Sequence, residues 1–317
     1  MAQYLVTGGA GFIGSHLVEE LLRRGHGVRV ADNFATGHRE NLPSSGRVEL
    51  VEADLAEPGV AARAMASVDY VLHQAAIPSV PRSVEDPAGS HRANVDATLE
   101  VLIAARDARV KRLVFAGSSS VYGNSAVLPK REDMRPSPLS PYALQKHIGE
   151  QYCQLFTSLY GLETVVTRYF NVFGPRQSPE SPYSGVIARF IDALSEGRAP
   201  TVHGDGRQTR DFTYVADVVA GVLRCCDAPG VAGEVINVAA GGRVSLLEVV
   251  GALQRITRHE VAPTFAAART GDVRDSQADI FKARKLLGFE PTVPFEEGLR
   301  RTVAWYHSRS TGRGVSA

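Results

Sequence analysis

Short apolar runs alternate with longer segments of helical periodicity through the first half of the chain. Between the first two runs, Ile13, Leu17 and Leu21 repeat on one helical face, and Gly25 suits the C-terminal end of that helix. The apolar runs themselves have the length and composition of strands and lie at residues 4–6, 28–31, 48–51, 70–72, 113–116, 165–167 and 235–238. The alternation predicts an α/β fold, a Rossmann-type doubly wound parallel sheet with helices on both faces.

The pattern loosens after Asn171, and a stretch rich in Pro, Ser and Gly predicts a loop over 174–185. Helical periodicity returns near residues 186–196, 216–227, 246–257, 279–287 and 295–306. The last ten residues, 308–317, are typical of a frayed tail. We therefore expect a sheet domain and a smaller C-terminal α/β domain, divided as 1–170 with 211–238 returning to it, and 171–210 with 239–307.

Composition and charge narrow the class of protein. The 35 Lys and Arg residues nearly balance the 34 Asp and Glu residues, which argues against binding to nucleic acid or to an anionic membrane. Three cysteines without a CxxC pair predict neither a disulfide framework nor a metal site. The N-terminus lacks a signal-peptide pattern and no run of 18 apolar residues occurs, so we expect a cytoplasmic protein.

The turn after the first strand carries glycines at a fixed spacing. Gly8, Gly11 and Gly14 form a G-x-x-G-x-x-G variant of the dinucleotide-binding fingerprint. Glycine lets the backbone turn sharply and approach a pyrophosphate, whose charge sits at the N-terminus of the following helix. Asp32 ends the next strand, where its carboxylate can hold ribose hydroxyls and repel a 2′-phosphate. The pattern therefore favours NAD over NADP.

Two further strand ends offer cofactor contacts. Asp54 and Leu55 end the third strand and can reach the adenine, although Asp54 is also a candidate helix N-cap. Gln74, Ala75 and Ala76 follow the fourth strand, where small residues let a cofactor pass close to the backbone. We interpret His73, which precedes them, as a structural histidine.

A second constellation carries acid–base chemistry. Tyr142 and Lys146 are four residues apart in a predicted helix, so one ligand can touch both. A neighbouring ammonium favours the phenolate, which predicts a Tyr142 pKa below its usual value of about 10. A solvated surface pair is the alternative. Ser118, Ser119 and Ser120 end the fifth strand and would meet the pair at the carboxyl edge of the sheet, where ligands bind in such folds.

The runs TGGAGFIG, SSSVYG, YALQK, RYFNVFGPRQ and GDGRQTRDFTYV resemble extended short-chain dehydrogenases/reductases, and within them the nucleotide-sugar 4-epimerases. HQAAIPSVPRSVEDP and GDVRDSQAD are most similar to bacterial UDP-N-acetylglucosamine 4-epimerases. The resemblance spans residues 3–306 and implies NAD as cofactor and a UDP-sugar as substrate. It also implies that Tyr142 is the base, Lys146 a cofactor ligand and Ser118 a proton relay.

Other roles come from the same resemblance. Additional cofactor contacts are implied for Phe12, Ile13, Asn33 and Asn94. Arginine suits a diphosphate because its planar fork matches phosphate oxygens, although on sequence alone a surface charge is the commoner role of an arginine. Substrate contacts are implied for Ser79, Ser119, Ser120, Asn171, Val186, His203, Arg210, Arg269, Asp272 and Ser276. At the position of Ser276, a small residue would admit an N-acetyl group that a tyrosine would exclude.

Three function classes are weighed against one another. A redox-neutral epimerase fits best, because lyases of the same scaffold carry acidic residues where this chain has Ser119 and Ser120. A cofactor-binding regulator without chemistry is disfavoured by the joint presence of Ser118, Tyr142 and Lys146. UDP-glucuronate is the chief competing substrate, and Arg82 is the cation that the motifs offer its carboxylate. Surplus apolar residues in 91–107 and 141–160 further predict a homodimer.

Overall fold

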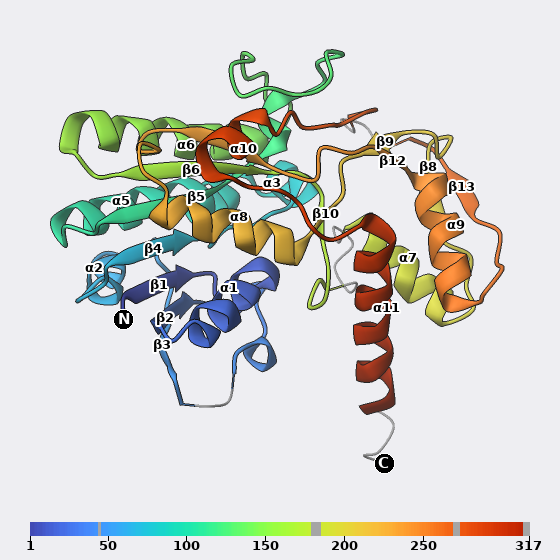
Figure 1. Cartoon of the computed structure of the whole chain (residues 1–317), viewed down its shortest axis with the longest axis horizontal. Helices are drawn as coiled ribbons and strands as arrows, with labels where there is room; N and C mark the ends of the chain where they lie inside the picture. Colours follow the sequence, from blue (N-terminus) through green and yellow to red (C-terminus); the bar gives the residue numbers. More distant parts are fainter. Residues whose placement is uncertain (44–45, 179–184, 269–272, 313–317) are drawn as a thin grey trace.

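The computed structural model describes the whole chain except residues 44–45, 179–184, 269–272 and 313–317. Its main element is a seven-stranded parallel sheet in the order β11-β6-β5-β4-β1-β2-β3 (Figure 1). The strands are β1 (Gln3–Thr7), β2 (Gly27–Asp32), β3 (Val48–Glu52), β4 (Tyr70–His73), β5 (Arg112–Ser118), β6 (Thr164–Tyr169) and β11 (Val235–Val238). The predicted strands and the doubly wound sheet are confirmed, and β11 returns to the sheet as expected.

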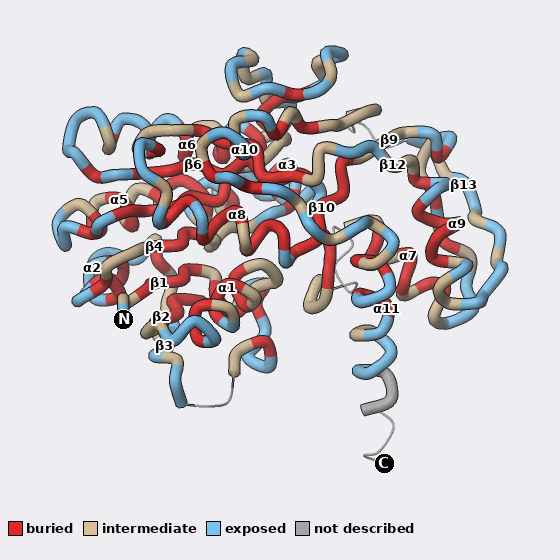
Figure 2. Tube along the Cα trace, in the orientation of Figure 1, coloured by how far each residue is buried: buried red, intermediate tan, exposed pale blue. Residues whose placement is uncertain are grey.

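Helices cover both faces of this sheet. On one face lie α1 (Phe12–Arg23) and α8 (Val215–Asp227), and on the other α2 (Val60–Ala64), α5 (Ala97–Asp107) and α6 (Pro141–Tyr160). Alternate strand residues point to the two faces, so Val6 packs with α1 while Leu5 packs with α2 and α5. Because both faces are covered, most strands are buried nearly throughout, whereas β3 at the edge of the sheet has no fully buried residue (Figure 2).

Short helical segments position the residues at the sheet edge. Between β4 and β5 the chain forms α3 (Val80–Glu85), α4 (Pro87–His91) and a π-helical turn, η2 (Arg92–Asp96), that leads into α5. The 3-10 turns are η1 (Arg39–Asn41) and η3 (Ser119–Tyr122). Before α6, the Ser140 hydroxyl accepts the Ala143 N–H at 3.2 Å and Pro141 occupies the first helical position. This cap fixes where α6 begins and therefore where Tyr142 stands.

The second half of the chain gathers beyond the carboxyl ends of the strands. There α7 (Val186–Ser195), α9 (Leu246–Thr257) and α11 (Phe295–Gly312) pack against one another, on the right of Figure 1, while α10 (Phe281–Leu287) packs against β11 and α8. Three small sheets pair β7 (Val172–Phe173) with β10 (Thr213–Tyr214), β9 (Thr209–Arg210) with β12 (Val244–Ser245), and β8 (Thr201–His203) with β13 (Thr264–Ala266). The predicted helices are confirmed; the division into two domains stays a prediction.

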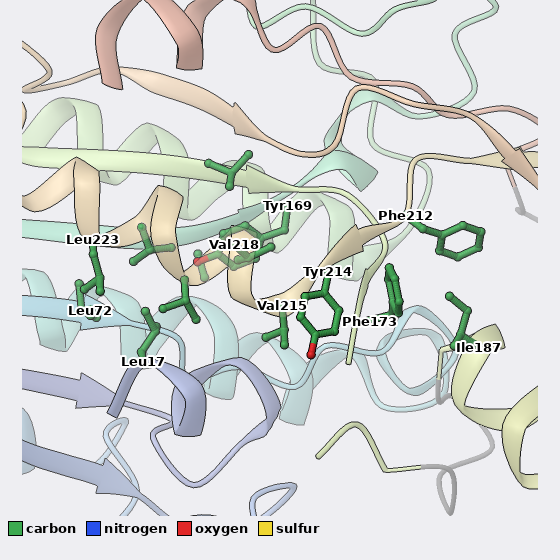
Figure 3. Close-up of a cluster of buried hydrophobic side chains, with 14 of the residues drawn as sticks. Leu17, Leu72, Tyr169, Phe173, Ile187, Phe212, Tyr214, Val215, Val218 and Leu223 are labelled. Atoms are coloured by element: carbon green, nitrogen blue, oxygen red, sulfur yellow. The ribbon is translucent and has the colours of Figure 1, made fainter. Parts of the chain in front are cut away.

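One hydrophobic cluster joins the two halves. Leu17 and Leu72 on the sheet side contact the same buried core as Phe212 and Ile187 on the other side (Figure 3). Phe173 lies between them and meets the rings of Phe212 and Tyr214 edge-on, with centroids 6.3 and 5.7 Å away. The elements beyond the sheet are thus fixed to it by packing in a shared core.

The C-terminal prediction needs correction. Residues 308–312 are not a frayed tail, because α11 continues to Gly312. The Ser308 hydroxyl donates to the Trp305 carbonyl at 2.8 Å, and the Arg309 guanidinium lies over the Trp305 ring, so local contacts extend the helix. Within the described ranges, the helices are too short or too polar to cross a membrane.

Candidate active site

The glycine turn is as tight as its spacing predicts. Gly8 has φ +65°, and a Cβ there would lie 2.7 Å from the Ala75 nitrogen. A Cβ on Gly14 would lie 2.2 Å from the Gly8 carbonyl oxygen. Gly11 is the N-cap of α1 and makes no side-chain cap, so no capping side chain competes with an anion for the first N–H groups of the helix. The neighbouring Phe12 and Ile13 are half-buried and pack against the core.

Asp32 is held at the end of β2. One carboxylate oxygen accepts the Ala10 N–H at 2.9 Å and the other accepts the Phe34 N–H at 2.8 Å. Each oxygen keeps a further lone pair for a hydroxyl. Asn33 is exposed, and its side-chain oxygen accepts the Ala35 N–H at 3.1 Å. The carboxylate is therefore oriented before any ligand binds.

The residues after β3 separate into two roles. Asp54 accepts the Ala56 N–H at 2.9 Å and pairs with Arg92 at 3.3 Å. It does not cap a helix, because α2 begins after Gly59, so that alternative is wrong. Leu55 is buried in the core beneath the sheet.

The end of β4 is organised around Thr7. Its hydroxyl lies 2.7 Å from His73 Nδ1 and accepts the N–H groups of Gln74 and Ala75 at 3.1 and 3.2 Å. His73 Nε2 lies 3.0 Å from the Thr98 hydroxyl, and burial, helped by the Lys146 charge, lowers the pKa of His73 to about 3. His73 is thus a neutral structural residue. Ala76 follows, half-buried.

Asn94 connects the loop after β4 to α6 by hydrogen bonds. Its side-chain oxygen accepts the Ile77 N–H at 2.7 Å, and its amide donates to the Gln145 side chain at 2.8 Å. Gln145 also accepts the Ser90 hydroxyl at 2.8 Å. In this structure Asn94 therefore links the loop after β4, through Ile77, to α6, through Gln145.

Ser118, Ser120 and Tyr142 meet at the carboxyl end of β5. The hydroxyls of Ser118 and Ser120 are 2.8 Å apart, and the backbone N–H of Tyr142 donates to the Ser83 hydroxyl at 3.0 Å. Burial raises the pKa of Tyr142, while a hydrogen bond with Ser118 lowers it less. The predicted lowering of this pKa is wrong for this structure, because burial outweighs it. Ser119 is half-buried in η3 beside them.

Lys146 is buried one helical turn after Tyr142. Its ammonium donates to the Ala116 carbonyl at 2.8 Å and lies 5.0 Å from the centre of the Phe115 ring. Burial lowers the pKa of Lys146 to about 8, and the charge of Glu150 opposes this. In this arrangement the ammonium is aimed at β5 and not at the phenol.

Two predicted substrate residues from distant segments are in contact. Asn171, just after β6, has φ +31°, and its amide donates to the Ser276 hydroxyl at 3.3 Å. The Ser276 N–H donates to the Thr209 carbonyl at 3.1 Å. Beside it, Arg210 donates to the carbonyls of Thr209 and Arg274 at 3.0 and 2.8 Å. These segments form one surface beyond the sheet edge.

The remaining predicted substrate residues are less clustered. Val186 begins α7 and packs against the core. His203 ends β8, with Nδ1 3.1 Å from the Ala267 carbonyl. Ser79 is the N-cap of α3 and accepts the Arg82 N–H at 3.1 Å. Arg269 and Asp272 lie outside the described residues.

Sequence reasoning missed Asp211, a buried carboxylate that organises the substrate side. It accepts the N–H groups of Ala240, Gly241 and Ala278 at 3.2, 3.0 and 3.0 Å. Burial raises the pKa of Asp211 to about 7 against these hydrogen bonds. The sequence offered one signal for Asp211, since it directly follows Arg210, a predicted substrate residue. Among the described residues, His, Cys, Asp and Glu side chains form no group of three placed to hold a metal.

Comparison with known proteins identifies the family. The sequence model of the NAD dependent epimerase/dehydratase family matches residues 4–239. The UDP-glucose 4-epimerase of Mycolicibacterium smegmatis is 40% identical over 311 residues, covering 96% of this chain and 99% of that protein. The chain belongs to this family.

Solved structures agree with this assignment. The UDP-N-acetylglucosamine 4-epimerase of Methanobrevibacter ruminantium, in complex with UDP-N-acetylmuramic acid, matches with a TM-score of 0.93 at 37% identity, covering 97% of this chain and 99% of that chain. The UDP-glucose 4-epimerase of Thermus thermophilus, in complex with NAD, matches with a TM-score of 0.87 at 37% identity, covering 99% and 100%. This member of the family is therefore an NAD-dependent enzyme of the nucleotide-sugar epimerase group.

The residues at the sheet edge fit NAD. Gly8 and Gly14 allow a turn too tight for any Cβ, which brings the backbone close to the N-terminus of α1, and Asp32 offers free lone pairs to ribose hydroxyls. Gln74 Nε2 is buried without a hydrogen-bond partner in the described part of the chain, although its oxygen accepts the Tyr169 hydroxyl at 3.1 Å. A buried polar atom without a hydrogen-bond partner lowers stability unless a ligand supplies the missing hydrogen bond. The enzyme would hold NAD with the glycine turn, Asp32, Gln74 and Lys146.

Proposed function

We propose that this enzyme interconverts UDP-N-acetylglucosamine and UDP-N-acetylgalactosamine by inverting C4 of the sugar through a transient 4-keto sugar. The contact between Asn171 and Ser276 carries the choice of sugar, because it sets a small, polar side chain beside a residue implied to touch the sugar. A serine leaves volume for an acetamido group and can hydrogen-bond it. We expect slower action on UDP-glucose and UDP-galactose.

The residues divide the chemistry between them. Bound NAD supplies the acceptor and the donor of the hydride at C4. The Tyr142 phenolate removes the proton of the 4-hydroxyl, and Ser118, which hydrogen-bonds with Tyr142, relays it. Lys146 supplies positive charge that favours the phenolate. Arg210, whose guanidinium is held by two backbone carbonyls, binds the diphosphate.

Tyr142→Phe tests the reaction itself. We expect a loss of turnover of about 100- to 10,000-fold with NAD binding and folding retained, because the ring and its packing stay. Tyr160→Phe, an exposed tyrosine of the same helix, is the control and should keep wild-type turnover. Turnover by Tyr142→Phe above half the wild-type rate would contradict the proposal that Tyr142 is the base.

Ser276→Tyr tests the sugar. Product analysis without added cofactor should cover UDP-N-acetylglucosamine, UDP-glucose, UDP-galactose and UDP-glucuronate. We expect the tyrosine to lower kcat/KM far more for the N-acetylated sugar than for the plain hexoses, while Ser276→Ala, which keeps the space, preserves it. Equal losses on both classes would contradict the proposal.

UDP-glucuronate is the main competitor. A uronate needs a cation for its carboxylate, and Arg82, the cation that the motifs offered, is exposed on α3. A wild-type preference for UDP-glucuronate would replace the proposed substrate. Release of CO2 or water would instead indicate a decarboxylase or dehydratase.

We also propose a homodimer formed through α6. Leu144, Leu155 and Leu159 leave 48, 48 and 67% of their surface exposed on this helix. Three residues that the prediction counted as surplus, Val95 and Leu102 in 91–107 and Phe156 in 141–160, are buried in the chain's own core, so the prediction is wrong for them. Leu99 and Ile103 of 91–107 are half-buried. A light-scattering mass equal to the 34.1 kDa chain at micromolar concentration would contradict a dimer.

A cytoplasmic location stays a prediction.

A further inference from the structure

A buried ion pair joins α6, the helix that carries Tyr142 and Lys146, to the strand β6. Glu150 follows Lys146 by one helical turn on α6, and Arg168 reaches it from β6. The guanidinium makes two parallel hydrogen bonds to the carboxylate, at 2.9 Å from Nε and 2.8 Å from Nη2. The two side chains are 1 and 4% exposed. The roles proposed for Tyr142, Lys146 and Ser118 leave this pair without a function.

We propose that Glu150 is a positioning residue that keeps Lys146 in its ammonium form, and that Arg168 fixes the Glu150 carboxylate for this purpose. The inference rests on the proposed function, since it concerns the charge that Lys146 brings to Tyr142. In this proposal Glu150 contacts neither cofactor nor substrate and influences the reaction only through the charge of Lys146.

Among the groups whose charge acts on Lys146, Glu150 is the carboxylate, and it lies one helical turn away on the same helix. On α6 the charge of Lys146 is influenced by Glu150 and by the buried thiol of Cys153, and β4 contributes the neutral His73. Glu150 is in turn faced by Arg168 of β6 and by His147 of α6. Among these groups of the described chain, Glu150 alone is a carboxylate. A buried ammonium bonded to one carbonyl is costly unless an anion lies close, because burial penalises the charged form.

The carboxylate is held in one place from several sides. A Cβ at Gly117 would lie 3.1 Å from Glu150 Oε1, so the glycine of β5 makes room for the acid. His147 Nδ1 lies 3.5 Å from the other oxygen. Arg168 is itself fixed, since its guanidinium lies 4.7 Å from the centre of the Tyr122 ring, and the Tyr122 hydroxyl donates to Asn237 at 2.7 Å. An ion pair that only joined α6 to β6 could have its carboxylate at another buried position of α6, and would not need it one helical turn from Lys146.

Glu150→Gln in the NAD-loaded enzyme tests this through the pH dependence of kcat/KM, measured with whichever tested UDP-sugar the wild type converts fastest. Without the carboxylate, Lys146 loses its proton at lower pH. We expect the alkaline limb of the profile to move down by at least one pH unit, with at least about fivefold lower kcat/KM at pH 8 and a much smaller loss at pH 6.5. Glu163→Gln is the matched control, because Glu163 pairs with Arg112 at the opposite end of β5. It should leave the profile unchanged.

A second readout does not depend on activity. The chain has five lysines, Lys111, Lys130, Lys146, Lys282 and Lys285, so carbon-13-labelled lysine gives a simple spectrum in which Lys146→Met assigns the Lys146 signal. Its titration midpoint should fall by at least one pH unit in Glu150→Gln. Since that variant leaves Arg168 unpaired and can fail to fold, Glu150→Gln/Arg168→Met removes both charges and should shift the midpoint the same way.

The outcomes separate the two proposals. Wild-type pH profile and Lys146 titration in either Glu150 variant would overturn the inference and leave Tyr142 and Lys146 untouched. Wild-type turnover by Lys146→Met would overturn the proposed role of the lysine, whatever the Glu150 variants do.

Discussion

The cofactor edge of the large sheet and the substrate surface beyond it are held by different kinds of contact. At the cofactor edge, strand ends and helix starts fix the positions, as Thr7, Asp32 and Asn94 show with their buried hydrogen bonds. On the substrate side, two- and three-residue strands and carbonyl contacts hold Arg210 and Ser276.

The difference teaches that the two binding steps tolerate change differently. The cofactor edge has no spare volume at its glycines, so a single carbon atom disrupts it. On the proposed substrate surface we expect changes of side chain to alter affinity and preference before they alter folding. Four substitutions test this contrast.

Gly14→Ala should have the largest effect. Its Cβ would lie 2.2 Å from a backbone oxygen, which the turn can relieve only by moving away from the pyrophosphate position. We expect NAD affinity to fall by more than about 100-fold, measured by calorimetry on cofactor-free protein. Gly251→Ala, in α9 with Arg255 as its nearest neighbour at 3.7 Å, is the control. Near-normal NAD affinity in Gly14→Ala would show that the turn adapts.

Arg210→Met should affect the other side alone. Loss of a charge-assisted contact to a diphosphate should raise KM for the UDP-sugar by about 10- to 100-fold and leave NAD affinity unchanged. Arg274→Met, a neighbour whose ion pair with Asp205 is exposed, should change KM little. A parallel loss of NAD affinity in Arg210→Met would contradict the separation of the two sides.

His73→Gln sharpens the comparison through pH. The pKa of His73 falls from 6.5 to about 3 because of burial and then Lys146, so the folded ring is neutral while the unfolded ring takes up a proton below 6.5. His73 therefore destabilises the fold as the pH drops from about 6.5 towards 3, by about 1 kcal/mol between pH 7 and 5.5. Urea unfolding at both values should show a smaller loss in His73→Gln. Identical losses would mean that the ring is protonated in the fold.

Gly251→Ala carries the smallest effect and should be favourable. An alanine in the interior of α9 meets no clash and removes chain entropy from the unfolded state, which is worth about 0.5–1 kcal/mol. Thermal unfolding should show a rise in Tm with unchanged turnover. Destabilisation would mean that the substrate half is packed as tightly as the cofactor edge.

The same contrast explains what the sequence could predict. Strands and glycine turn were predictable because both faces of the sheet are buried and the backbone constraints are local. The contact between Asn171 and Ser276 depends on loops more than 100 residues apart, so the resemblance alone pointed to both residues. The direction of the Tyr142 pKa and the role proposed for Glu150 depend on burial, which spacing along one helix does not reveal.

The position of β6 has a consequence for synthesis of the chain. This strand is buried along its whole length, and its outer edge pairs with β11, which begins only at Val235. A nascent chain that has reached residue 170 therefore presents an open, apolar strand edge, the kind of surface that pairs with other chains. The segment 171–234 must be made before that edge closes, so the sheet is completed only after residues 171–210, the first part of the predicted substrate domain, have been made.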